Sequence, residues 1–598
     1  MSIQKIKKPS HEIEEKSELK EAILSAKKSF FVTGFFSMFV NILMLVPPLY
    51  MLQLYDRVVT SRSNDTLIML TALVVVLFIT MSALEIVRSK ILMKIANKLD
   101  AQLSSRVFNT LFDLANKRPG KATSQPMSDL TSVKQFLTGN GVFAFFDAPW
   151  LPIYIAILYM FHPYFAYFAI FAALVLLSFA LINEYVTKEK LLDANNLNRD
   201  ANLFVDANLR NAEVINAMGM KENILKMWQS KYFSFLHAQN EASAKASVWA
   251  NISKTTRMLF QSLMLGLGGY LAIHDEVTAG MMIAGSIMMG RALAPLDLMI
   301  NTWKQFSAAR TSYSRLNSLL DEFPENKEYM ELPAPKGELL LEEVVVIPPA
   351  AENPSVAGIS MLINEGDIVG LIGPSAAGKS SLARAILGIW PLAAGTVRLD
   401  GADIHQWDKT LLGKYVGYLP QDVELFYGTV SQNIARFEDV DSVKVVEAAK
   451  KSGVHEMILR LPDGYDTIIG VGGASLSGGQ RQRVGFARAI YDNPVLVVLD
   501  EPNSNLDDQG EAALVQAIAQ LRAQKTTVIL ITHRPAILKV TNKVAVMKDG
   551  RLEAYGPTNE ILGQMQAAMQ KAQQAQQQAQ AQAIAKATQN ANSNKQGS

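Results

Sequence analysis

Six apolar runs occupy the first half of this 598-residue chain, and each approaches the length of about 20 residues that crosses a bilayer as a helix. They form three close pairs, of which the last is weaker. Prolines lie in or near several runs, which packed membrane helices tolerate. Buried core helices are the alternative, but six paired runs of this length favour a membrane bundle. The runs cover roughly Ser29–Leu54, Thr66–Val87, Gly141–Tyr159, Pro163–Asn183, Met258–Ile273 and Ala279–Ile300.

Charges in the connections predict the orientation of this bundle. The long connections between runs two and three and between runs four and five are rich in Lys and Arg, whereas the three short connections hold almost none. Because positive charge stays in the cytoplasm, we expect the N-terminus and both long connections there. Their composition is helical, so each arm of about 25 residues would project about 40 Å from the membrane.

Overall composition excludes several classes of function. Lys+Arg 57 against Asp+Glu 55 gives a net charge of +2, so there is no electrostatic case for a nucleic-acid or strongly acidic partner. Cys 0 excludes disulfides, thiolate metal clusters and cysteine nucleophiles. The charged N-terminus has no apolar core before a small-residue cleavage site, so we expect no removable signal peptide.

A change of composition follows the sixth run and divides the chain into domains. LPAPKG at 332–337 is typical of a linker, and beyond it strand-like runs such as VVVI and VLVVL alternate with helical stretches, as in an α/β domain. The end of the chain is rich in Ala and Gln, and we assign it no function. We expect a cytoplasmic segment 1–28, a membrane domain 29–325, a linker 326–337, an α/β domain 338–565 and a tail 566–598.

One glycine-rich segment fits the phosphate-binding pattern G-x-x-x-x-G-K-[ST]. It follows the strand-like Asp367–Ile372 and precedes a helical stretch, which is the context that the pattern requires. Its backbone N–H groups would surround phosphate, Lys379 would neutralise the β/γ charge, and the Ser380 hydroxyl would bind Mg²⁺. The predicted ATP-binding residues are Gly373, Pro374, Ser375, Ala376, Ala377, Gly378, Lys379, Ser380 and Ser381.

Two carboxylates end the apolar run Val495–Leu499, which is typical of a parallel strand covered on both faces. At the carboxyl end of such a strand they would lie beside the phosphate loop. We expect Asp500 to hold the metal through water and Glu501 to polarise the attacking water as general base.

The motifs between and after these elements indicate a family. LSGGQ at Leu476–Gln480, the apolar strand with Asp-Glu, Ser504–Asp507 and a lone His533 after the strand-like Thr527–Thr532 follow the phosphate loop in this order. The set resembles the nucleotide-binding domain of ABC transporters, with Gln421 at the Q-loop position. The resemblance implies an ATPase with ATP and Mg²⁺ as cofactors. The expected fold class is a six-helix membrane bundle of ABC exporter type followed by an α/β P-loop ATPase domain.

The resemblance also implies a role for each matching residue. Ser477 and Gly479, with Gly478 and Gln480, would bind the ATP held by the opposite domain. Gln421 would sense metal and water, His533 would contact the γ-phosphate, and Asp507 would communicate across the dimer. Ser380, Gln421 and Asp500 form the implied Mg²⁺ set.

The chain departs from the family at the adenine site. The family usually has an aromatic residue that stacks on the base some 25 residues before the phosphate loop. Here the segment reads Val345-Val-Ile-Pro-Pro-Ala350, without an aromatic side chain. We therefore expect base stacking to be weaker or supplied otherwise, with a less certain preference for ATP over GTP.

Three stretches outside the ATPase resemble the transporters of type I secretion systems, especially the metalloprotease-exporting PrtD type. They are Tyr55–Val59 with Asp65–Leu67, Phe146–Tyr154 and Arg210–Met220. This resemblance implies a homodimer in the bacterial inner membrane, a periplasmic adaptor, an outer-membrane channel, and an unfolded polypeptide cargo with a C-terminal signal. The first run begins near residue 29, so we expect no N-terminal peptidase-like domain and no processing of the cargo.

Other functions remain open from sequence alone. The nearest is a half-transporter for lipid, drug or small peptide with the same ATP chemistry. A soluble, non-transporting ABC ATPase would lack the apolar runs, and a heterodimer is not required because both halves of the ATP site are intact.

Ionisable residues near the membrane runs are candidates for a polar translocation path. Glu85 and Arg88 end run two, Asp147 lies in run three, and Arg291 and Asp297 lie around run six. Residues at the ends of runs could instead sit at the interface. Our hypothesis is that Asp147→Ala blocks export and spares ATP binding.

Overall fold

The computed structural model describes residues 17–118, 123–209, 211–324, 332–349, 351–473, 475–567 and 570. They form two compact units, each of which is described by itself. The first holds the described residues of 1–113 and 122–324, and the second holds those of 114–121 and 325–598. The expected N-terminal segment as far as residue 16, Arg210, Ala350, linker residues 326–331 and the tail apart from 566, 567 and 570 lie outside the described residues.

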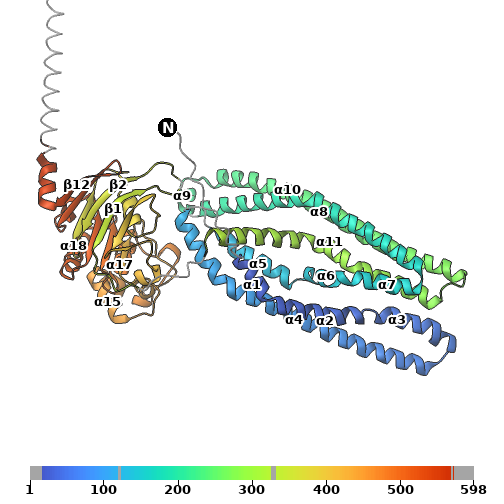
Figure 1. The fold of residues 1–598 in the computed structure, drawn as a ribbon. Helices are drawn as coiled ribbons and strands as arrows, with labels where there is room; N and C mark the ends of the chain where they lie inside the picture. The colour runs from blue at the N-terminus through green and yellow to red at the C-terminus, as the bar shows by residue number, and fades with distance from the viewer. Residues whose placement is uncertain are drawn as a thin grey trace, which may run out of the picture. The chain divides into compact units, whose positions relative to one another are not determined.

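Long helices make up the described part of the first unit (Figure 1). Several of them, such as α8 and α10, pack lengthwise on each other. In chain order they are α1 (Glu18–Ser25), α2 (Lys27–Leu43), α3 (Val46–Gln53), α4 (Asn64–Lys117), α5 (Gln125–Thr138), α6 (Gly141–Asp147), α7 (Leu151–Phe161), α8 (Pro163–Leu209), α9 (Ala212–Ala217), α10 (Lys221–Ile273) and α11 (Ala279–Glu322).

Five helical stretches among the described residues are long and apolar enough to cross a membrane, and they contain five of the six predicted runs. The stretches are Lys27–Val59, Asn64–Lys117, Gly141–Phe161, Pro163–Leu209 and Ala279–Glu322. The remaining predicted run is the end of α10, which is less apolar than these five. Its Phe260, Met264 and Leu271 are nevertheless buried in one apolar cluster with side chains of α7, α8 and α11, so α10 packs into the same bundle.

Prolines mark where two of the runs change direction or helical form. In the first run α2 ends before Pro47 and Pro48, which occupy the first turn of α3, where no backbone N–H is needed. A π-helical turn over Leu54–Val59 follows α3. In the third run a 3₁₀ turn over Ala148–Trp150 separates α6 from α7.

Helices α4 and α8 continue well beyond the apolar runs. From Val87 to the end of α4 there are 30 residues, and from Asn183 to the end of α8 there are 26. At a rise of about 1.5 Å per residue these arms are about 45 and 39 Å long. The arm of α4 packs with α1, α5 and α11 in an apolar cluster that contains Leu19, Leu103 and Leu316.

The second unit contains a six-stranded sheet and a four-stranded sheet within the described residues. The larger has the order β12-β11-β3-β10-β9-β6, and its strands are parallel except for the edge strand β12. The smaller is antiparallel, in the order β2-β1-β4-β5. Their strands are β1 (Leu339–Val346), β2 (Val356–Ile363), β3 (Ile368–Ile372), β4 (Ala394–Leu399), β5 (Ala402–Asp403), β6 (Val416–Leu419), β9 (Leu496–Asp500), β10 (Thr527–Ile531), β11 (Lys543–Lys548) and β12 (Arg551–Pro557).

The central strands are buried from end to end, because helices and the smaller sheet cover both faces of the larger sheet. Every residue of β3, β9 and β10 is buried, as the unbroken apolar runs in the sequence predict. The helices that bear on the site are α12 (Lys379–Ile386), α17 (Gly478–Ile490) and α18 (Asp508–Ala523). The elements are therefore those predicted, a bundle of long apolar helices followed by an α/β domain.

Candidate nucleotide site

Four neighbouring parallel strands end at one edge of the larger sheet, and each leads into a predicted site segment. In the sheet register Ile531 of β10 pairs with Leu371 of β3 and with Asp500 of β9, and Leu419 of β6 pairs with Leu499. The phosphate loop follows β3, His533 follows β10, Glu501 follows β9 and Gln421 follows β6. The order of the strands in the sheet therefore brings together residues that are more than a hundred positions apart in the sequence.

The phosphate loop is held by two glycines in conformations that other residues rarely adopt. Gly373 has φ +153° and Gly378 has φ +91°. A Cβ on Gly373 would lie 2.1 Å from the Met547 carbonyl oxygen, and one on Gly378 would lie 2.1 Å from the Ser355 carbonyl oxygen. Because both neighbours are backbone, neither clash can be relieved by a rotamer change. Backbone of β11 and of the residue before β2 thus fixes the loop that we expect to bind phosphate.

Lys379 begins α12 and folds back over the loop. Its Nζ donates hydrogen bonds to the carbonyl oxygens of Gly373 at 2.9 Å and Pro374 at 2.8 Å. Burial lowers the pKa of this ammonium group, and the nearby carboxylates of Glu501 and Asp500 oppose that shift. The lysine is therefore a buried cation at a helix N-terminus, a position that attracts anions.

Asp500 is the last residue of β9 and is almost fully buried. Burial raises its pKa, a hydrogen bond from Ser380 lowers it, and the charge of Glu501 raises it. Its Oδ1 is buried and has no hydrogen-bond partner in the part of the chain that the structure describes. An unpaired buried carboxylate oxygen beside a hydroxyl fits a hydrated cation, so the predicted Mg²⁺ set is chemically suitable.

Protein groups alone do not form a metal cage in this region. The described residues contain no cluster of three or more His, Cys, Asp or Glu side chains that could hold an ion. Mg²⁺ usually takes one or two carboxylates and completes its shell with water and substrate phosphates. One carboxylate from Asp500, one hydroxyl from Ser380 and the Gln421 amide agree with that mode.

The three predicted catalytic residues meet around one carboxylate. Gln421 Nε2 donates to Glu501 Oε2 at 3.1 Å, and His533 Nε2 lies 3.6 Å from Glu501 Oε1. Glu501 has φ +49°, and its backbone N–H donates to the Ile531 carbonyl at 3.0 Å. A left-handed conformation is costly for glutamate and is held only by its surroundings. The carboxylate is therefore fixed between two polar side chains at the edge of the sheet.

The LSGGQ segment forms the start of α17. Ser477 caps the helix by accepting a hydrogen bond from the Gln480 backbone at 3.3 Å, and the Gln480 side chain accepts one from the Ser477 N–H at 2.8 Å. A Cβ on Gly479 would lie 2.6 Å from the Asn505 carbonyl oxygen. No hydrogen bond among the described residues joins this segment to the phosphate loop of the same chain. Its binding to ATP of an opposite domain stays a prediction.

Gln482 is a site residue that sequence reasoning missed. Its side chain is buried and donates to the Glu501 carbonyl at 3.1 Å and to Ser504 Oγ at 3.3 Å, while Oε1 accepts from the Asn505 N–H at 3.0 Å. It thereby joins α17 to the segment that follows β9. Asp507 in that segment caps α18 by accepting from the Gly510 N–H at 2.8 Å, and its predicted role across a dimer is untested.

In the membrane unit, two of the predicted path carboxylates are paired inside the protomer. Asp147 Oδ1 lies 3.1 Å from Arg88 Nη1 and accepts from Asn41 Nδ2 at 2.8 Å. Asp297 lies 3.4 Å from Arg257. Neither Glu85 nor Arg291 has an ion pair among the described residues.

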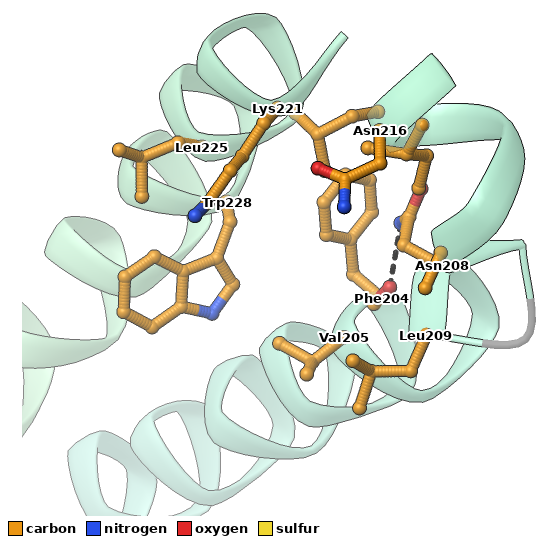
Figure 2. Close-up of a pocket in the computed structure, with 11 residues that line it drawn as sticks. Phe204, Val205, Asn208, Leu209, Asn216, Lys221, Leu225 and Trp228 are labelled. Carbon is orange, nitrogen blue, oxygen red and sulfur yellow. Dashed lines mark hydrogen bonds between the residues drawn. The ribbon is translucent and has the colours of Figure 1, made fainter. Parts of the chain in front are cut away.

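A cavity of about 460 Å³ lies at the turn where α8, α9 and α10 meet (Figure 2). Its lining is mostly apolar, with Phe204 from α8 and Trp228 from α10 among the larger side chains (Figure 2). This turn contains most of the third stretch that resembles secretion transporters. The residues that line the cavity all belong to the first unit.

Comparison with known proteins agrees with both units. Residues 30–294 match the family model described as ABC transporter transmembrane region, and residues 356–504 match the one described as ABC transporter. The chain is 44% identical over 546 residues to the type I secretion system ATP-binding protein PrsD of Rhizobium meliloti, covering 91% of this chain and 94% of that protein.

More distant similarities cover a comparable share of the chain. It is 27% identical to the leukotoxin translocation ATP-binding protein LktB of Mannheimia haemolytica, covering 90% of this chain and 77% of that protein. A solved structure of a bacterial Atm1-family ABC exporter with ATP bound is similar in fold, with a TM-score of 0.79, 20% identity, and coverage of 92% of this chain and 98% of that one. The chain is therefore an ATP-hydrolysing membrane protein of the ABC transporter family, and within it a member of the group of type I secretion ATP-binding proteins.

Proposed function

We propose that this chain is the inner-membrane motor of a type I secretion system and moves an unfolded polypeptide out of the cytoplasm. The observation that carries the proposal is the 44% identity to a type I secretion ATP-binding protein, because it extends over 91% of the chain and so includes the membrane unit. The intact nucleotide site supports an active motor rather than a passive subunit.

Hydrolysis is assigned to residues at the edge of the sheet. Lys379 and the start of α12 bind the β- and γ-phosphates. Glu501, held by Gln421 and His533, takes a proton from water as the water oxygen bonds to the γ-phosphorus and the bond to ADP breaks. Ser380, Asp500 and Gln421 would hold Mg²⁺, which neutralises phosphate charge.

The site requires a second copy of the chain. Ser477 and Gly479 lie at the N-terminus of α17, where a helix dipole favours an anion. Within the described parts of the chain, none of their hydrogen bonds reaches the phosphate loop of their own chain. A homodimer supplies these residues to the opposite ATP, with Asp507 at the same interface. Closure on ATP would move the arms and shift the membrane domains between inward and outward states, and hydrolysis would reset them.

Orientation and partners follow from the same proposal. The Lys- and Arg-rich arms support a cytoplasmic position for the ATPase domain in a bacterium. A periplasmic adaptor and an outer-membrane channel would continue the path, and the cargo would carry an uncleaved C-terminal signal.

Secretion in a host without its own exporter tests the proposal. The chain would be co-expressed with a neighbouring adaptor, a channel and a candidate cargo, with Glu501→Gln as the control. Cargo in the medium with the intact chain but not with the variant establishes ATP-driven protein export. ATP hydrolysis without any cargo would instead favour the transport of lipid, drug or small peptide.

A further inference from the structure

A second cavity, of about 190 Å³, lies between α5, α8 and α11 in the arms of the first unit. Its lining is polar, in contrast to the apolar cavity of Figure 2, and four of its residues are asparagines from α8. The volume is below the range of about 300–1,000 Å³ that is typical of pockets for whole small-molecule ligands. It suits one segment of a longer, extended ligand.

The floor of this cavity is a rigid charge network. Asp129 of α5 is almost fully buried and accepts hydrogen bonds from Arg315 Nε at 2.9 Å and from Ser312 Oγ at 3.0 Å. Arg315 Nη2 also donates to Asp129 Oδ1 at 2.5 Å, so the guanidinium contacts the carboxylate at two points. No hydrogen bond from Arg315 Nη1 is found within the part of the chain that the structure describes. The guanidinium is therefore fixed on one side and has donors free on the other.

The opposite wall presents amide groups and a second arginine. Asn195, Asn198 and Asn202 are three and four positions apart on α8, so they lie on one face of the helix. Arg199 lies between them, and its ion pair with Asp200 is long, at 3.9 Å. Arg199, Arg315 and Asp129 are the charged residues that line the cavity, which leaves one positive charge in excess.

The position of the cavity separates it from the lipid. Asn195 is 12 residues beyond the predicted membrane run that ends at Asn183, and Arg315 is 15 residues beyond the run that ends at Ile300. At about 1.5 Å per residue, both lie about 18–22 Å along their helices beyond the predicted ends of the membrane runs. At this distance we expect the cavity residues not to reach lipid headgroups, whereas a polypeptide that approaches the membrane domain from the cytoplasm would pass them.

We propose that this cavity binds an extended, acidic segment of a polypeptide before it enters the membrane domain. Asparagine amides donate and accept hydrogen bonds, as peptide groups do, so they bind a backbone without selecting its side chains. No hydrogen bond from the Arg199 guanidinium or from Arg315 Nη1 is found among the described residues. These donors then select carboxylates, because guanidinium binds them through paired hydrogen bonds. This inference rests on the proposed protein export and names its cargo-binding site.

Binding to the purified full-length chain tests the site directly. The probes are a fluorescein-labelled, unstructured Gly-Ser-Asp peptide and a Gly-Ser-Lys peptide of the same length, followed by fluorescence anisotropy. We expect the acidic peptide to bind more tightly. Arg199→Gln should weaken its binding about tenfold, as loss of one charge-assisted hydrogen bond does, and Asn198→Leu should weaken the binding of both peptides about fivefold, as loss of one neutral hydrogen bond does. The controls are Lys188→Gln on α8 and Asn251→Leu on α10, which are exposed and do not line the cavity.

The outcomes separate this site from the proposed function. Equal binding of both peptides, or equal loss in the control variants, overturns the site. So does displacement of the peptide by inorganic phosphate at equal concentration, because that would identify a site for small anions. If secretion by the intact chain persists while Arg199→Gln and Asn198→Leu bind as the wild type does, export stands and the cavity is excluded. If no cargo is secreted and neither peptide binds, both proposals are overturned.

Discussion

Gln421 Nε2 donates a hydrogen bond to Glu501 Oε2 over 3.1 Å, which joins the end of β6 to the end of β9. His533 Nε2 lies 3.6 Å from the other oxygen of the same carboxylate. Both contacts orient Glu501 without neutralising it by a permanent cation, since histidine is charged only when protonated. A carboxylate held in this way can accept a proton from water.

The first prediction concerns this carboxylate. Glu501→Gln keeps the size of the side chain and a hydrogen-bonding partner for Gln421 but removes the base. We expect ATP hydrolysis to fall about 10²- to 10⁴-fold, the range for loss of a general base, while ATP binding persists because Lys379 and Asp500 are unchanged. Phosphate release and binding of a fluorescent nucleotide measure the two effects. Hydrolysis within threefold of the wild type would contradict the assignment.

A second prediction concerns Gln482, which positions Glu501 through its backbone. Gln482→Leu leaves the Asn505 N–H without its side-chain acceptor and should lower the free energy of unfolding by about 1–3 kcal/mol. We expect kcat for ATP to fall about tenfold with KM little changed, because the phosphate loop is intact. The exposed Gln516→Leu on α18 is the control. An equal rise in KM would indicate a general loss of structure instead.

Glu501 and Gln482 show which site residues can be predicted from the sequence and which cannot. Glu501 could be predicted because an unbroken apolar run ending in carboxylates specifies a buried parallel strand and the position of its end. Gln482 could not, because its role depends on how α17 packs on the segment after β9. In the sequence it is one polar residue in a basic helix, and helical periodicity does not distinguish it from its neighbours.

In the membrane unit, too, some structural features could be predicted from the sequence and others could not. Apolar length predicted the positions of the long helices. The prolines were expected only to be tolerated in packed membrane helices, and the interruptions of the first and third runs were not predicted. The π-helical turn at Leu54–Val59 and the pairing of Arg88 with Asp147 were not predictable. Both depend on contacts between helices that are distant in the sequence, for which hydropathy gives no signal.

A third prediction tests Asp147, which the structure pairs with Arg88 and Asn41. Asp147→Ala leaves the arginine buried without a carboxylate, and breaking a buried pair costs about 3–5 kcal/mol. We expect loss of cargo secretion with ATP binding retained, since the nucleotide site belongs to the other unit. Glu85→Gln is the matched control, because Glu85 has no ion pair in the part of the chain that the structure describes. Unchanged secretion by Asp147→Ala would exclude a role for this pair in export.

A fourth prediction concerns acid stability and His405 of the ATPase domain. Burial lowers the pKa of His405 below its usual value of 6.5, and the charge of Lys409 lowers it further. The unfolded chain therefore binds this proton more readily than the folded chain, so stability falls as pH drops below about 6.5. Thermal unfolding at pH 7 and pH 5 should show a larger loss for the wild type than for His405→Gln. Identical losses would exclude this histidine as a cause.

The last prediction concerns the base of the nucleotide. The segment that follows β1 has no aromatic side chain, yet its end lies beside the phosphate loop. The Ser355 backbone N–H donates to the Val346 carbonyl at 2.9 Å, and the Ser355 carbonyl oxygen adjoins Gly378. Stacking on an aromatic ring is worth about 1–3 kcal/mol per base and tolerates any base, so its absence should weaken the binding of ATP and GTP alike. With no base-selective contact identified at this segment, we expect the two nucleotides to lie within about fivefold in kcat/KM. Pro348→Tyr should then lower the KM for ATP with kcat unchanged. A strong preference for ATP in the wild type would show that another part of the site recognises adenine.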